Sequence, residues 1–303
     1  MSLGLNENSS QENPIRPRLP DWLKVKMPGG PRYIELQQLM RSQRLHTVCE
    51  EAHCPNIGEC WERGTATFMI LGDICTRACR YCAVKTGWPT QFDEMEPVRL
   101  SQTVKAMNLT YCVITSVNRD DLDDGGASVF ANCINQIHST LPSCKVEVLI
   151  PDFMGSTEAL NIVVDASPDV LNHNIESTRS VFPLVRAKGD YDRSLNLLAA
   201  SKRRNPTIPT KSGIIVGMGE SVEEILQTMR DLRNVDCDLL TIGQYLRPSR
   251  AHLPMDRYYT PQEFEDLEKQ GKQLGFKHIA SGPLVRSSYH ADEQHKSAMT
   301  SLD

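Results

Sequence analysis

Two groups of three closely spaced cysteines constrain this chain more than any other feature of its sequence. Together they place six of the chain's ten cysteines between positions 49 and 82 of 303 residues. The groups read Cys49-x4-Cys54-x5-Cys60 and Cys75-x3-Cys79-x2-Cys82. Three thiolates are one fewer than a closed tetrahedral metal site requires. The sequence therefore predicts two metal centres, each with one position that is open or filled by another group.

A zinc ribbon or zinc knuckle is an alternative for the second group of cysteines. Such a site would need a fourth Cys or His at regular spacing. His46, His53 and His138 are candidates, but none of them repeats the cysteine pattern. The spacing therefore disfavours a zinc-binding interaction protein, and the colour of the protein purified without oxygen separates a colourless zinc site from a brown iron-sulfur site.

Composition restricts the class of protein further. A chain of 303 residues with 40% hydrophobic residues is long enough for one large α/β barrel or two average domains, and one barrel is the simpler interpretation. The polar opening has no leader pattern, and no run of 18 apolar residues predicts a membrane span. We therefore expect a cytoplasmic protein whose cysteines stay reduced. The net charge of -5 argues against general nucleic-acid binding.

The pattern along the chain predicts four parts. Residues 1–18 read as a mobile terminus because they are polar and lack an apolar period. Residues 19–64 form an extension that carries the first cysteine group, residues 65–283 form the main domain, and residues 284–303 form a C-terminal segment. We expect the extension to lie across one mouth of the domain that follows it.

Within the main domain, short apolar runs alternate with helical patterns. This alternation predicts a parallel sheet whose polar residues gather at the carboxyl ends of the strands, where barrel active sites form. The expected strands are 68–71, 111–115, 145–150, 170–174, 212–216, 239–242 and 278–280.

Two helices in this domain have readable starts. Ser221 with Glu224 forms a capping box, and Thr260 with Glu263 forms another that is followed by a proline at the first helical position. Gly275 is placed to end the second of these helices.

The second cysteine group, with Tyr81 before its last cysteine, resembles the CxxxCxxC signature of the radical S-adenosylmethionine (SAM) superfamily. The resemblance implies a partial (β/α)6 TIM-like barrel in which Cys75, Cys79 and Cys82 hold three irons of a 4Fe-4S cluster. SAM would chelate the fourth iron and yield a radical that abstracts hydrogen from an unactivated carbon. The resemblance implies SAM contacts at Tyr81, Thr115, Ser116, Asn118, Arg119, Asn172, Asn174, Glu176 and Gly217.

The first group, in the frame CEEAHCPNIGEC, and the run Arg286-Ser287-Ser288-Tyr289 together resemble lipoyl synthases over about residues 20–291. That family implies a second, auxiliary 4Fe-4S cluster on Cys49, Cys54 and Cys60, with Ser288 as its fourth ligand. Serine oxygen is a poorer match to iron than thiolate, so the resulting labile iron suits a cluster that is consumed as a sulfur donor. Of the other four cysteines, Cys112, Cys133 and Cys237 lie in apolar patterns and Cys144 lies beside a turn, and all four read as small buried hydrophobes.

The resemblance implies that two sulfur atoms are inserted at C6 and C8 of an octanoyl-lysine, with two SAM molecules used per product. The partners would be an octanoylated lipoyl domain or H protein and a small electron donor such as ferredoxin or flavodoxin. Another radical SAM sulfur-inserting enzyme, such as a biotin synthase, is the nearest alternative, but biotin synthases lack the first cysteine group. An iron-sulfur electron carrier is the alternative from another class, and it would make no 5'-deoxyadenosine from SAM.

Overall fold

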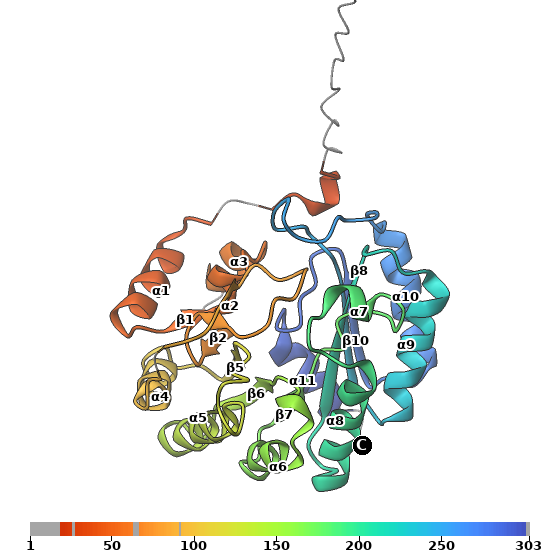
Figure 1. The fold of residues 1–303 in the computed structure, drawn as a ribbon. Helices are drawn as coiled ribbons and strands as arrows, with labels where there is room; N and C mark the ends of the chain where they lie inside the picture. The colour runs from red at the N-terminus through yellow and green to blue at the C-terminus, as the bar shows by residue number, and fades with distance from the viewer. Residues whose placement is uncertain (1–18, 26–27, 63–66, 91, 301–303) are drawn as a thin grey trace, which may run out of the picture.

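Seven parallel strands form the centre of the fold in a computed structural model that describes residues 19–25, 28–62, 67–90 and 92–300 (Figure 1). The expected mobile terminus, residues 1–18, and the expected boundary after residue 64 lie outside these ranges. The parallel strands are β2 (Thr67–Ile70), β5 (Tyr111–Ser116), β6 (Lys145–Leu149), β7 (Val170–Asn172), β8 (Thr210–Val216), β9 (Leu239–Gln244) and β10 (His278–Gly282).

The strands pair in the order β1-β2-β5-β6-β7-β8-β9-β10, and β1 (His46–Thr47) is the only one of them that runs antiparallel to its neighbour among the described residues. Within those residues no pairing joins β2 to β10, so the sheet curves into a barrel that stays open on one side. Six strand–helix units followed by β10 confirm the expected partial (β/α)6 barrel.

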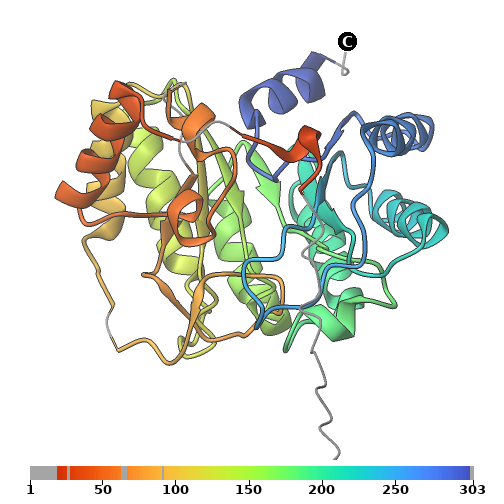
Figure 2. The ribbon, with the colours of Figure 1, turned by 90° about the horizontal axis from the view of Figure 1, so that it is seen from above.

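Helices follow the strands and cover the outer face of the sheet (Figures 1 and 2). Both expected capping boxes are present, at Ser221 and Thr260, and Gly275 adopts a positive φ directly after the second helix. The outer helices are α4 (Glu96–Ala106), α5 (Ala127–Thr140), α6 (Thr157–Asp165), α8 (Tyr191–Arg204), α9 (Val222–Asn234) and α10 (Pro261–Gln273).

Short elements connect these units or precede them. The small parallel pair β3 (Ile74–Cys75) and β4 (Lys85–Thr86) brackets the second cysteine group. The N-terminal part contains η1 (Asp21–Leu23), α1 (Pro31–Ser42), α2 (Val48–Glu51) and α3 (Ile57–Glu62), and later connections contain η2 (Phe153–Gly155) and α7 (Phe182–Val185). No helix in the described ranges is long and apolar enough to cross a membrane.

The last helix, α11 (Ala291–Thr300), lies at the amino ends of the strands. Ala298 packs there with Val170 and Leu239, the first residues of β7 and β9. The rings of His295 and Tyr111, the first residue of β5, are 5.7 Å apart. The chain after β10 therefore runs from the carboxyl end of the barrel to its amino end.

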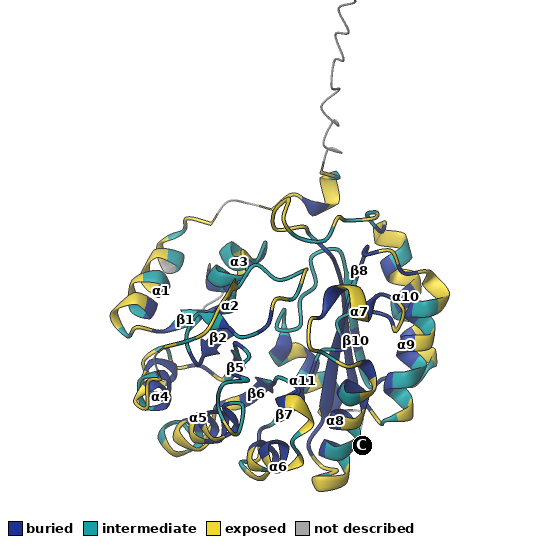
Figure 3. Cartoon of the chain, in the orientation of Figure 1, coloured by how far each residue is buried: buried dark blue, intermediate teal, exposed yellow. Residues whose placement is uncertain are grey.

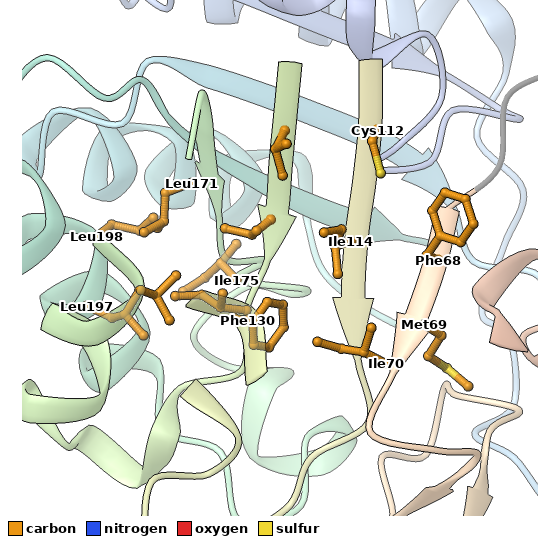
Figure 4. Packing of buried hydrophobic residues seen from close by; sticks show 14 of the residues in the cluster. Phe68, Met69, Ile70, Cys112, Ile114, Phe130, Leu171, Ile175, Leu197 and Leu198 are labelled. Atoms are coloured by element: carbon orange, nitrogen blue, oxygen red, sulfur yellow. The ribbon is translucent and has the colours of Figure 1, made fainter. Parts of the chain in front are cut away.

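Apolar side chains of the strands and outer helices form one large core (Figure 4). Buried residues are concentrated on the strands, and the outer helices also carry exposed residues (Figure 3). Its interior also contains charge, because the Lys211 ammonium lies 2.9 Å from the Glu147 carboxylate and both side chains are buried. The expected strand over 170–174 ends at Asn172, and β8 begins at Thr210, two residues before the expected start. The strand was expected to begin after Lys211 because a charged residue does not match the pattern of an apolar strand. In the structure Lys211 is part of β8 and points into the barrel.

Candidate active site

A cavity of about 330 Å³ opens at the carboxyl ends of the strands. Side chains at the ends of five strands contribute to its wall, which matches the usual place of a barrel active site. Segments from both terminal parts of the chain also line it, namely residues 48–49, 52–55 and 285–288. Five of the six grouped cysteines reach this cavity: Cys49, Cys54, Cys75, Cys79 and Cys82.

The second cysteine group lies in a loop that starts at β3. The backbone N–H of Asn118 donates to Cys75 Sγ at 3.3 Å, and its side-chain amide does so at 3.6 Å. Thr76 donates through its backbone and its hydroxyl to the Asn118 carbonyl, both at 3.0 Å. The loop after β5 therefore fixes the first cysteine of the group and supplies donors to its sulfur.

Arg77 ties the same loop to two further strand ends. Its buried guanidinium binds Asp120 with Nε and Nη2, and Nη2 lies 2.6 Å from Asp152. Burial works to raise the pKa of Asp152, but the hydrogen bond and charge of Arg77 outweigh it and bring this pKa to about 2. Arg193 reaches the other oxygen of Asp152 at 3.1 Å. The cysteine loop is thus anchored by a permanently charged network.

A second charged group faces the cavity from the end of β7. Burial raises the pKa of Glu176, while the charge of Arg186 opposes the rise. Arg186 also donates to the Asn174 carbonyl at 2.6 Å. Burial raises the pKa of Tyr81 well above its usual range, so its ring enters the cavity as a neutral phenol. This wall offers one carboxyl, one guanidinium and one hydroxyl to a polar ligand.

Six of the nine residues expected to contact SAM line the cavity: Tyr81, Thr115, Ser116, Asn118, Asn174 and Glu176. The other three do not line it. Arg119 is turned toward Asp121 and the Leu71 carbonyl. Asn172 donates to Glu147 inside the barrel at 3.1 Å, and the Gly217 N–H donates to Glu220 at 2.6 Å. The side chains of Arg119 and Asn172 and the backbone N–H of Gly217 therefore each make a contact within the protein.

The first cysteine group lies on the two short helices at the open side of the barrel. Cys49 is in α2, Cys60 is in α3, and Cys54 lies between them. A second cavity of about 50 Å³ is lined by all three cysteines together with Arg286 and Ser288. Ser288 lines both cavities, whereas Ser287 lines only the larger one.

The C-terminal segment is fastened to α3 and the loop before it. The Asn56 amide donates to the Leu284 carbonyl at 2.6 Å. The Tyr289 hydroxyl donates to Glu59 at 3.0 Å, and His290 Nε2 lies 3.4 Å from the same carboxylate. Because Glu59 precedes Cys60 and Tyr289 follows Ser288, these contacts bring Ser288 to the first cysteine group.

Burial governs the acidity of the grouped thiols. It raises the pKa of Cys49 and of Cys82 to about 12, and it raises those of Cys54 and Cys79 as well. Thiols in such surroundings ionise only with a metal, so metal binding releases protons. Among the described residues, no three Cys, His, Asp or Glu side chains gather closely enough to hold a single metal ion.

Comparisons with known proteins agree with this arrangement. Residues 69–232 match the radical SAM superfamily, and residues 3–54 match the N-terminal domain of lipoyl synthase. The lipoyl synthase of Rubrobacter xylanophilus is 58% identical, with 92% of this chain and 87% of that protein covered. The lipoyl synthase of Shouchella clausii is 53% identical, with 94% and 93% covered. This chain belongs to the lipoyl synthase family.

Solved structures with low sequence identity support the fold alone. Methylornithine synthase superposes with a TM-score of 0.53 at 13% identity, over 74% of this chain and 73% of that chain. Streptococcus suis SuiB bound to S-adenosylmethionine gives 0.55 at 11% identity, over 82% and 60%. Membership of the radical SAM superfamily implies a 4Fe-4S cluster and SAM as cofactors of this lipoyl synthase family member.

The cavity suits those cofactors on the evidence of its own atoms. Ser116 Oγ, Asn118 Oδ1 and Asn174 Oδ1 line it and are buried without a hydrogen-bond partner among the described residues. Buried polar atoms normally have partners, so these positions await a polar ligand. Sequence reasoning had missed Arg77 and Arg186 as cavity residues. The arginine of the CxRxC frame was visible, but its partners lie on other strands.

Proposed function

We propose that this chain inserts two sulfur atoms, at C6 and C8, into an octanoyl group carried on a lysine of a small carrier domain. The family supplies the reaction class, and the cavity supplies the support for it. The one observation that carries the proposal is that a single cavity is lined by cysteines of both groups and by Ser288. A sulfur-inserting site needs a radical source and a sulfur source on either side of one substrate carbon.

Cys75, Cys79 and Cys82 are assigned to the cluster that cleaves SAM, and the loop anchored by Arg77 orients them. Reductive cleavage there supplies methionine and a 5'-deoxyadenosyl radical able to abstract hydrogen from an octanoyl carbon. Ser116, Asn118 and Asn174 offer their unpartnered atoms to SAM. Tyr81 and Glu176 lie on the same wall, where a neutral phenol and a carboxyl suit an adenosine and an ammonium group.

Cys49, Cys54, Cys60 and Ser288 are assigned to the second 4Fe-4S cluster, whose sulfides would be the sulfur source. Three thiolates hold such a cluster firmly, whereas a serine oxygen is a harder and weaker ligand for its fourth iron. Half-buried Arg286 lines the same small cavity and adds positive charge beside the thiolates. Each of the two carbons requires one hydrogen abstraction, so two SAM molecules are expected per product.

The acyl-lysine arm would extend into the larger cavity, where Val84, Ile214 and Ile215 provide apolar contacts. We assign its origin to an octanoylated lipoyl domain or H protein, and the electron to a ferredoxin or flavodoxin. Residues 19–64 and 284–303 then act as appended segments that complete the barrel site.

Mass analysis of an octanoylated lipoyl-domain peptide after anaerobic turnover tests the proposal. With SAM and dithionite, the peptide should gain first one and then two sulfur atoms, and two 5'-deoxyadenosines should form per lipoyl group. Formation of 5'-deoxyadenosine without sulfur gain would reject sulfur insertion while leaving SAM cleavage intact.

A further inference from the structure

Three arginines lie exposed beside the cavity without a carboxylate partner in the described part of the chain: Arg80, Arg247 and Arg250. Arg179 and Arg204 are also exposed, but they are paired with Asp192 and Asp165 respectively, each at 2.8 Å. The whole chain carries a net charge of -5. On this acidic protein, Arg80, Arg247 and Arg250 form a local positive rim beside the second cysteine group.

Backbone contacts hold this rim together. The Leu253 N–H donates to the Arg80 carbonyl at 2.9 Å, and His252 Nε2 lies 2.9 Å from the Cys82 carbonyl. Arg247 binds the carbonyls of His252 and Arg250 with its guanidinium. The loop over 246–253 therefore rests directly on the loop that carries the second cysteine group.

The charges of two of these arginines act on one residue of the cavity wall, Tyr245. Burial raises the pKa of Tyr245, and the charges of Arg247 and Arg80 oppose this rise. Tyr245 lines the cavity, and its hydroxyl donates to the Leu253 carbonyl at 2.9 Å. Positive charge from both loops thus converges at one edge of the cavity, next to Cys79 and Cys82.

We propose that Arg80, Arg247 and Arg250 form the docking surface for a small acidic protein that carries one electron at a time. The inference rests on the proposed function, because it needs a SAM-cleaving cluster on the adjacent cysteines. Each SAM cleavage consumes one electron, the docked carrier loses that electron, and it leaves oxidised by one. Complementary charge raises the rate of such encounters more than it raises their final affinity.

The position of the rim favours an electron carrier over the acyl-carrier domain. Arg80 lies between Cys79 and Cys82 in the sequence, so a protein docked on it places its redox group against the cysteine loop. Electron transfer needs this proximity because its rate falls steeply with distance. An acyl-lysine arm is long and needs only access to the cavity, not contact with the cysteine loop.

The test compares two reductants on the holoenzyme. Reduced flavodoxin at limiting concentration, or dithionite, drives SAM cleavage without acyl substrate, and 5'-deoxyadenosine is measured. Arg80→Gln combined with Arg250→Glu should lower the flavodoxin-driven rate roughly tenfold at low ionic strength, with the difference fading as salt is added. The dithionite-driven rate should stay unchanged. Arg203→Glu is the matched control, since Arg203 is exposed at the end of α8, toward the other end of the barrel.

If Arg80→Gln also lowers the iron content, the single variant Arg250→Glu is measured in place of the double variant. Arg250 lies outside the cysteine loop, so its replacement should leave the iron content unchanged. A wild-type flavodoxin-driven rate and salt dependence in this variant would overturn the proposal. So would a raised KM for the octanoylated carrier domain with dithionite, accompanied by a normal flavodoxin-driven rate, because the rim would then bind the acyl carrier. A wild-type enzyme that fails to insert sulfur with dithionite speaks against the proposed function and not against the docking surface.

Discussion

The two cysteine groups are built in opposite ways. The second group lies in one loop beside β3, and neighbouring strand ends hold that loop through Asn118 and the Arg77 network. The first group lies on two short helices, and its cavity is completed only by Ser288, far along the chain. One site is thus fixed by the rigid barrel, while the other is assembled from both ends of the chain.

This difference fits the chemistry assigned to each site. A cluster that cleaves SAM repeatedly has to survive every turnover, and a charged network anchors its loop. A cluster that gives up sulfur has to be opened and rebuilt, and a C-terminal segment held by side-chain contacts can leave more easily than a barrel strand. Four predictions test this contrast, beginning with the largest expected effect.

Removing one cysteine from each group should separate the two chemistries. We expect Cys79→Ala to abolish SAM cleavage, and Cys54→Ala to abolish sulfur insertion while leaving some SAM cleavage. The measurements are 5'-deoxyadenosine formation and the mass of the octanoyl peptide. Iron content and circular dichroism serve as controls, because loss of a cluster can also loosen the fold. A Cys54→Ala enzyme that still makes lipoyl peptide would contradict the division.

Replacing Ser288 should weaken only the site assembled from the chain ends. Ser288→Ala is expected to assemble its cluster on three cysteines but to lose most sulfur transfer, because the fourth iron lacks its oxygen ligand. Ser288→Cys should give a tighter and less reactive cluster, since thiolate suits iron better. Ser287→Ala is the matched control, as Ser287 lines only the larger cavity. An active Ser288→Ala enzyme beside an inactive Ser287→Ala enzyme would reverse the assignment.

The contrast between the two sites also explains which features of the fold and of the site could be predicted from the sequence. Cysteine spacing and helix caps are local patterns, so both groups and both capping boxes were readable. The alternation of apolar runs predicted the parallel sheet because each strand repeats the same signal, and the radical SAM resemblance implied the partial barrel. Pairings across the barrel leave no such signal: nothing near Asn172 shows that it will donate to Glu147, which also accepts from Lys211.

The same limit applies to the charged residues around the cavity. Arg77 and Asp152 are 75 positions apart, and only the parallel order of β2, β5 and β6 brings their loops together. Gly217 was expected at the ligand because glycine allows close approach. In the structure its positive φ of 100° serves a turn closed by Glu220. The glycine's conformational freedom thus serves a backbone turn at the end of β8, and a ligand contact at Gly217 stays a prediction.

Breaking the Arg77 network should weaken metal binding by the second cysteine group more than metal binding by the first. Arg77→Met leaves Asp120 and buried Asp152 without their main cation, which should cost about 3 kcal/mol of stability. We expect a lower melting temperature and loss of iron from the second cysteine group first. Arg204→Met is the control, because Arg204 pairs with Asp165 at the surface and such pairs contribute about 0–1 kcal/mol. Equal losses in both variants would show that the network does not anchor the loop.

The smallest expected effect concerns the contacts that hold the C-terminal segment to α3. Glu59→Ala and Tyr289→Phe both remove the hydrogen bond between Tyr289 and Glu59, worth about 0.5–1.5 kcal/mol, so sulfur insertion should fall roughly three- to tenfold. Glu59→Ala also removes the contact of His290 with the same carboxylate. SAM cleavage should not change, because neither residue lines the larger cavity. Glu62→Ala is the matched control, since the Glu62 carboxylate contacts the Tyr33 backbone instead of the C-terminal segment. Since Glu59→Ala already removes the interaction that Tyr289→Phe breaks, the double variant should be little worse than Glu59→Ala alone. Additive losses would mean that Glu59 and Tyr289 act separately, and that Ser288 is held in place by other contacts.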